Sequence, residues 1–162
     1  MIVLGVDPGL AHTGYGIILA AKNRFSLIDS GVIATSSSQT AGKRLEKIYT
    51  ELTKIIQKNK PDQAGVESLY FAKNSSSAIP VAQARGVVLL ALTQCGVATS
   101  EYPPQAIKQA IVGNGKAPKE QVQQLLQLLL GLQAIPTPDH AADALAAAVC
   151  HFNSSQVSLN DV

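Results

Sequence analysis

The segment from Ile2 to Val6 constrains the fold most, because five consecutive residues without a polar side chain leave no face for water. The turn-forming residues Asp7, Pro8 and Gly9 follow it directly. A short apolar run of this kind is typical of a central strand that is buried on both faces of its sheet. We therefore expect a sheet that is flanked by helices, which defines an α/β domain.

The segments that follow predict a mixed sheet of five strands. Residues 14–20 and 25–35 are rich in β-branched side chains and are separated by a turn at 22–24, so they are expected to form an antiparallel meander with the first strand. Two shorter strands, expected to be parallel, are predicted at 63–69 and 99–102. Apolar periodicity and capping signals predict helices at 41–59, 75–96, 104–112, 118–130 and from 137 to about 152.

Composition narrows the class of protein. With 46% hydrophobic and only 15% charged residues, the chain must fold, and its length of 162 residues fits one domain, which we place at residues 1–152. Residues 153–162 are rich in Ser and Asn and are expected to form a frayed or disordered tail. Two cysteines are too few for a disulfide framework. The most apolar helix is interrupted by polar residues and no leader segment is recognisable, so a cytoplasmic protein without a membrane span is predicted.

Three acidic residues occupy unusual positions. Asp7 ends the most apolar strand, Glu67 lies within another strand, and Asp143 lies in a helix of almost only Ala, Leu and Val. A carboxylate in apolar surroundings is costly unless a cation compensates it. A shared divalent ion explains all three together, and oxygen ligands favour Mg²⁺ or Mn²⁺, which assist phosphodiester hydrolysis.

Each of these residues also has a purely structural interpretation. Asp7 fits an ordinary turn, Glu67 fits an edge strand that faces solvent, and Asp143 fits the solvated side of its helix. The net charge of +2 permits nucleic-acid binding without arguing for it.

A fourth ligand is predicted on the last helix, at His140 or Asp139. Both share a helical face with Asp143, being three and four residues away, so spacing leaves the choice open. If Thr137 caps the helix, Asp139 falls in its first turn, where the helix dipole gives an anion a sufficient structural role. This position favours His140 as the ligand.

The chain resembles the RuvC family of Holliday-junction resolvases, which are crossover junction endodeoxyribonucleases. Five blocks occur in family order over nearly the whole sequence. They are Val6–Gly9 with Thr13–Gly16, Glu67 with Ala72–Asn74, Gln83–Val87, Lys108–Gln109 with Val112–Gly113, and Ala141–Ala146.

The resemblance implies an RNase H-like fold and a site that binds two Mg²⁺ ions per subunit, for which Mn²⁺ can substitute. By position, Asp7 bridges the two ions, Glu67 and Asp143 are further ligands, and His140 stands where many family members have Asp. The chain thus departs from the version of the site that contains carboxylates alone. The number and affinity of bound metals stay open.

The resemblance also implies contacts with DNA. Tyr70, with Phe71 beside it, matches an aromatic residue that lies at the unpaired centre of the junction, where stacking on bases is favourable. Lys108 and Lys119 match lysines that neutralise phosphate near the scissile bond. Weaker candidates for DNA binding are Lys73, Arg85 and Lys116.

The implied activity is resolution of four-way DNA junctions by paired symmetric nicks in strands of like polarity, which leave 5′-phosphates, in recombination and repair. The implied partners are a second copy of the chain, bound through the apolar helix at 75–96, and the RuvA and RuvB branch-migration proteins. Two alternatives stay open at this point. They are an ATP-binding enzyme of the actin and sugar-kinase superfamily, whose two domains would need a longer chain, and a junction-binding protein without catalysis.

Overall fold

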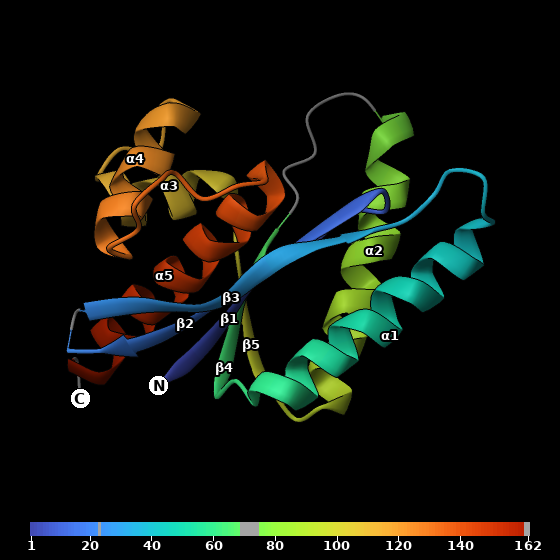
Figure 1. Cartoon of the computed structure of the whole chain (residues 1–162), viewed down its shortest axis with the longest axis horizontal. Coiled ribbons are helices and arrows are strands. Elements are labelled where there is room, and N and C mark those ends of the chain that lie inside the picture. Colours follow the sequence, from blue (N-terminus) through green and yellow to red (C-terminus); the bar gives the residue numbers. More distant parts are fainter. Residues whose placement is uncertain (23, 69–74, 161–162) are drawn as a thin grey trace.

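Five strands form one mixed sheet in the computed structural model, which describes residues 1–22, 24–68 and 75–160 (Figure 1). The strand order is β3-β2-β1-β4-β5. β1 pairs with β2 and β2 with β3 in antiparallel fashion, whereas β4 is parallel to β1 and to β5. This arrangement confirms the predicted mixed sheet. The strands are β1 (Ile2–Asp7), β2 (His12–Ala21), β3 (Arg24–Ala34), β4 (Gln63–Glu67) and β5 (Ala98–Tyr102).

Helices cover both faces of the sheet. Figure 1 shows α1 and α2 on one side and α3, α4 and α5 on the other. Within the described ranges, none of these helices is long and apolar enough to cross a membrane. The helices are α1 (Ala41–Asn59), α2 (Ser75–Gln94), α3 (Pro104–Val112), α4 (Lys119–Leu129) and α5 (Asp139–Asn160).

Alternation along β1 divides the core into two layers. Val3 packs with buried residues of α3, α4 and α5, whereas Leu4 and Val6 pack with those of α1 and α2. All three side chains are fully buried. Successive side chains of a strand point to opposite faces, so one apolar run supplies both cores.

Gly5 lets α5 lie directly against the sheet. A Cβ atom at this position would come within 1.8 Å of the Ala144 carbonyl oxygen and 2.7 Å of the Ala148 nitrogen. Gly14 of β2 has the same relation to α5, because its Cβ would lie 1.9 Å from the His140 carbonyl oxygen. The absence of side chains at these two positions therefore sets how closely the first turns of α5 approach β1 and β2.

Gly5→Ala is expected to lower the free energy of unfolding by about 3 kcal/mol or more, because the new methyl group meets rigid backbone rather than a mobile side chain. Urea denaturation measures this loss. Gly42→Ala in α1 is the matched control, since among the described residues no atom lies within 4 Å of its Cβ position. That change is expected to leave stability unchanged or raise it by about 0.4–1 kcal/mol. Equal effects of the two changes would contradict this account of Gly5.

Three helices differ at their ends from the sequence-based expectation: α2 ends at Gln94 rather than at residue 96, and α4 and α5 differ as follows. The Pro138 carbonyl accepts hydrogen bonds from the nitrogens of Ala141 and Ala142, so Pro138, not Thr137, occupies the cap position of α5. Asp139 is consequently the first helical residue. At the other end α5 continues to Asn160, and the prediction that it stops near Phe152 was wrong. Within this extension the Ser154 hydroxyl donates to the Cys150 carbonyl one turn earlier. α4 begins at Lys119, because Pro118 is its cap.

Candidate metal centre

Two parallel neighbouring strands bring Asp7 and Glu67 to the same edge of the sheet. β1 and β4 pair with Val6 opposite Val66, and each strand ends one residue later, at the carboxylate. Both side chains are partly buried. The two acidic residues, 60 positions apart in the sequence, therefore lie side by side because of the strand register.

The first turn of α5 completes the cluster. His140 Nδ1 lies 2.8 Å from Asp7 Oδ2, a hydrogen-bonding distance. Asp7, His140 and Asp143 each offer one ligand atom, and these atoms all lie within 4.8 Å of one another. Glu67 joins all three in the lining of one cavity of about 430 Å³. Asp139 lines no part of that cavity.

Burial and neighbouring negative charge both disfavour the ionised forms of Asp7 and Glu67. Burial, followed by the negative charges of Asp7 and Asp143, raises the pKa of Glu67 to about 8. Burial also raises the pKa of Asp7, against the lowering effect of its hydrogen bond with His140. Carboxyl groups with raised pKa values beside one another indicate a site that lacks compensating positive charge.

Lys119 provides part of that charge from α4. Its ammonium nitrogen lies 3.1 Å from Asp143 Oδ2 and 3.3 Å from Asp139 Oδ2. Burial lowers the pKa of Lys119, but its contacts with these two carboxylates outweigh burial and raise the pKa overall. Lys108 lies on α3, where its ammonium group donates to the Ala117 carbonyl at 3.0 Å. A cavity of about 200 Å³ has Glu67, Asp143 and both lysines in its lining.

The residues of the cluster fit a divalent cation. Three carboxylates and one imidazole line one cavity, and two of the carboxyl groups have pKa values that are raised first by burial and then by neighbouring negative charge. A single lysine does not neutralise three carboxylates, and hard oxygen ligands are those that Mg²⁺ and Mn²⁺ prefer. Asp7, His140 and Asp143, with Glu67 beside them, are the residues that would hold such an ion.

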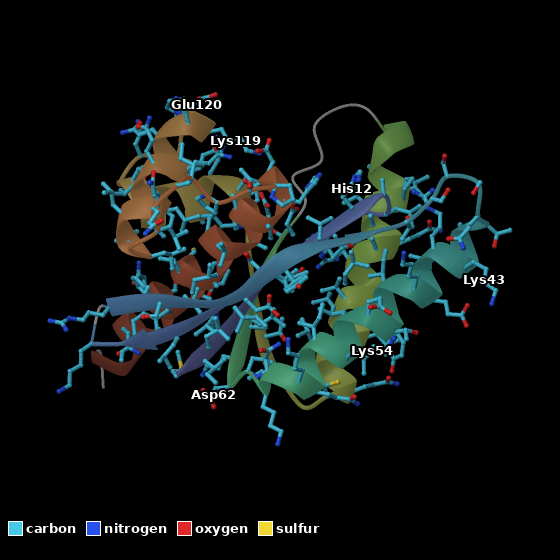
Figure 2. All side chains as sticks on the ribbon, in the orientation of Figure 1. His12, Lys43, Lys54, Asp62, Lys119 and Glu120 are labelled. Carbon is cyan, nitrogen blue, oxygen red and sulfur yellow. The ribbon has the colours of Figure 1, made fainter. Side chains whose placement is uncertain are left out.

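Two residues near the cluster were missed from the sequence. His12, at the start of β2 (Figure 2), stacks on His140 with ring centroids 5.5 Å apart and planes 13° apart. Gln123 of α4 donates from Nε2 to Asp139 Oδ1 at 3.3 Å. The position of His12 could have been predicted from the turn after Asp7, because an antiparallel strand that follows this turn begins close to Asp7. Nothing in the sequence pattern links Gln123 to Asp139.

Of the other residues predicted to bind DNA, Arg85 and Lys116 are described by the structure, and neither lines the two cavities at the acidic cluster. Arg85 of α2 makes two hydrogen bonds to the carboxylate of Glu101, at 2.5 and 2.6 Å. Lys116 is exposed in the turn before α4. Tyr70, Phe71 and Lys73 lie outside the described residues.

Comparison with known proteins identifies close relatives. The family model described as "Crossover junction endodeoxyribonuclease RuvC" matches residues 3–151. The crossover junction endodeoxyribonuclease RuvC of Treponema denticola is 54% identical over 155 residues, which cover 96% of this chain and 87% of that protein. The protein of the same name from Fusobacterium nucleatum is 49% identical over 154 residues, covering 95% and 81% of the two chains.

Solved structures agree with this result. The structure of Thermus thermophilus RuvC superposes with a TM-score of 0.91 at 33% identity and covers 98% of this chain and 97% of that one. RuvC of the same organism in complex with Holliday junction substrate gives a TM-score of 0.93 at 33% identity, with coverage of 98% and 96%.

Proposed function

The chain belongs to the RuvC family of crossover junction endodeoxyribonucleases, and we propose that it resolves Holliday junctions at the centre formed by Asp7, Glu67, His140 and Asp143. The observation that carries this proposal is the convergence of ligand atoms from Asp7, His140 and Asp143 within 4.8 Å of one another. Phosphodiester hydrolysis with metal assistance needs such a cluster of hard ligands beside the path of the DNA strand.

The four side chains would hold the metal, and we infer two Mg²⁺ ions per subunit, with Mn²⁺ as a substitute. A bound divalent ion supplies Lewis-acid polarisation of a phosphoryl oxygen. Asp7 and Glu67 are placed by strand register, and His140 and Asp143 by the first two turns of α5. Because rigid elements carry all four ligands, the site is preorganised.

Positive charge for the DNA backbone comes from α3 and α4. Lys108 and Lys119 line the same cavity as Glu67 and Asp143, so both lysines would attract a phosphate bound at the acidic cluster. We assign to these two lysines the neutralisation of phosphate near the scissile bond. Lys116 is exposed and lies three residues before Lys119 in the sequence. We assign to Lys116 and to Lys73 weaker contacts with the DNA backbone.

Arg85 has a less direct role in this scheme, because the Glu101 carboxylate already binds its guanidinium group. A phosphate would have to compete with that carboxylate. Tyr70 and Phe71 follow β4 within three and four residues of Glu67. We propose that one of them stacks on the unpaired bases at the junction centre, where each stacked base contributes about 1–3 kcal/mol.

A second copy of the chain is proposed to bind through α2. Exposed side chains along this helix recur at intervals of three and four residues, which places them on one face. Ile79 and Leu90 are 64% and 50% exposed on that face. Gly86 lies between them, and among the described residues no atom comes within 4 Å of its Cβ position. Gln83 and Thr93 share this face, so it carries two exposed apolar side chains around a glycine, and the glycine leaves space for a partner helix.

Leu90→Glu is expected to convert a dimer into a monomer, because a symmetric interface would bury two opposed carboxylates close to its axis. Sedimentation equilibrium measures the change in mass. Leu128→Glu on α4 is the matched control, since Leu128 is also exposed, at 75%, but lies on another helix. A wild-type monomer, or a dimer that both variants preserve, would contradict the α2 interface.

Two active centres in a symmetric dimer account for paired nicks in strands of like polarity, with hydrolysis leaving 5′-phosphates. We further propose, by family membership, cooperation with the branch-migration proteins RuvA and RuvB.

The test of function is a nicking assay on a synthetic four-way junction, with Mg²⁺ and then Mn²⁺, and with linear duplex of the same sequence in parallel. We expect symmetric nicks in the junction and little cutting of the duplex. Cutting of both substrates at equal rates would contradict junction selectivity. Cutting in the presence of a chelator would contradict the metal centre.

A further inference from the structure

Asp139 faces α4 rather than the metal cluster, although it is adjacent to His140. Its Oδ2 lies 3.3 Å from the Lys119 ammonium nitrogen, and its Oδ1 accepts a hydrogen bond from Gln123 Nε2 at 3.3 Å. Lys119 and Gln123 are four residues apart and share one face of α4. The Asp139 carboxylate is therefore held by two side chains of a neighbouring helix.

Lys119 in turn is shared by two carboxylates of α5. Its ammonium group lies between Asp139 and Asp143, which are four residues apart on one face of the helix. Asp143 belongs to the cluster of candidate metal ligands, and Asp139 does not. The side chain of Lys119 is 42% exposed, so it has room to shift between its two partners (Figure 2).

The ammonium group and a divalent cation compete for the same oxygen. Asp143 Oδ2 accepts from Lys119 at 3.1 Å, and a carboxylate oxygen in that contact is less available as a metal ligand. Without Asp139, Asp143 would be the one carboxylate partner that the described structure gives Lys119. Turning Asp143 toward a cation would then leave the ammonium group without a partner at the site.

Resting on the function proposed above, we propose that Asp139 is a positioning residue that acts through Lys119. It offers the ammonium group a second carboxylate, so that Asp143 turns to the cation while Lys119 stays beside the scissile phosphate. Gln123 keeps the Asp139 carboxylate pointed at α4. This role is distinct from metal ligation, for which Asp139 was the rival of His140.

The test is a double-mutant cycle on Mn²⁺ affinity, measured by electron paramagnetic resonance without DNA. Asp139→Asn is expected to weaken Mn²⁺ binding about tenfold, because Lys119 then binds Asp143 alone. Lys119→Met is expected to strengthen binding. In the Lys119→Met background, Asp139→Asn should change the affinity less than about twofold, since the ammonium group through which it acts is gone.

A loss of affinity of the same size in both backgrounds would overturn the proposal, because it would show a through-space charge effect or direct ligation by Asp139. Asp29→Asn, in β3, is the control for the loss of one negative charge away from the site. Asp139→Glu should restore much of the affinity, because it restores a carboxylate for Lys119.

Cutting and binding of junctions provide a second readout. Asp139→Asn is expected to slow single-turnover cutting about tenfold while junction affinity is unchanged or higher, because one negative charge near the DNA is removed. Weaker junction binding would contradict the proposal. A separate measurement tests the metal centre itself. If the four residues do not bind metal, Mn²⁺ affinity will be the same in the wild type and in Asp7→Asn.

Discussion

Asp7→Asn is expected to reduce junction cutting by about a thousandfold or more, since removing a ligand shared by the cluster costs several kcal/mol of transition-state stabilisation. Asp7 contacts His140 directly and lies beside Glu67 and Asp143, so its loss disorganises every other ligand. Junction binding should stay close to that of the wild type, because DNA affinity depends mainly on phosphate contacts from basic side chains. Single-turnover cutting and gel-shift affinity measure the two effects.

Asp62→Asn is the matched control for this change. Asp62 lies beside the opposite end of β1, where its carboxylate accepts a hydrogen bond from the Ile2 nitrogen, and an asparagine oxygen can accept the same bond. This variant should cut at nearly the wild-type rate. If Asp7→Asn lost junction binding together with cutting, a structural role for Asp7 would be indicated instead.

The second large effect is a dependence of stability on pH in the presence of a chelator. Burial and the charges of Asp7 and Asp143 raise the pKa of Glu67 from its usual 4.5 to about 8. Between these two values the folded chain holds a proton that the unfolded chain has lost, so stability must fall as the pH rises. We expect Tm to fall by on the order of 5 °C between pH 5 and pH 8, since 1 kcal/mol corresponds to about 2–4 °C in a domain of this size.

Glu67→Gln isolates the contribution of this residue. The variant should be more stable than the wild type at pH 8 in chelator, and this difference in stability should shrink toward pH 5. The same variant is expected to lose cutting activity, because Glu67 is a proposed metal ligand. Burial lowers the pKa of His151, which gives a dependence of opposite sign at acidic pH, but that effect cancels between the two proteins. Addition of Mn²⁺ at pH 8 should raise the Tm of the wild type. Parallel melting curves for both proteins over this range would contradict the account of Glu67.

The mixed sheet was predictable from the apolar and β-branched segments and the turns between them, and the acidic cluster from the positions of its carboxylates. A carboxylate costs too much in an apolar segment to be placed there without a function, so Asp7, Glu67 and Asp143 could be identified before their positions in space were known. Family membership and the fold decide against an ATP-binding enzyme and a binding protein without catalysis. The roles of individual residues stay predictions.

The different surroundings of His140 and Asp139 could not be predicted from the sequence, because both residues share a helical face with Asp143. They depend on the rotation of α5 about its axis, which packing against β1 and β2 fixes. The predicted cap of α5 was wrong by one residue. Thr137 has the better capping side chain, but the Pro138 carbonyl accepts the first helical hydrogen bonds. The contact between Asp139 and Lys119 joins two helices whose relative placement no local pattern encodes.

Gly5 and Gly14, which contact α5, determine how far its metal-ligand residues lie from those on the sheet. A methyl group at Gly14 would meet the carbonyl of His140 itself, so the helix could accommodate it only by tilting or by moving away from β2, where Gly14 pairs with Asp7. Either movement changes the separation of the ligands without altering any of them. Because ion selectivity depends on cavity size and ligand spacing, preference between Mg²⁺ and Mn²⁺ could be adjusted from positions that never touch the ion.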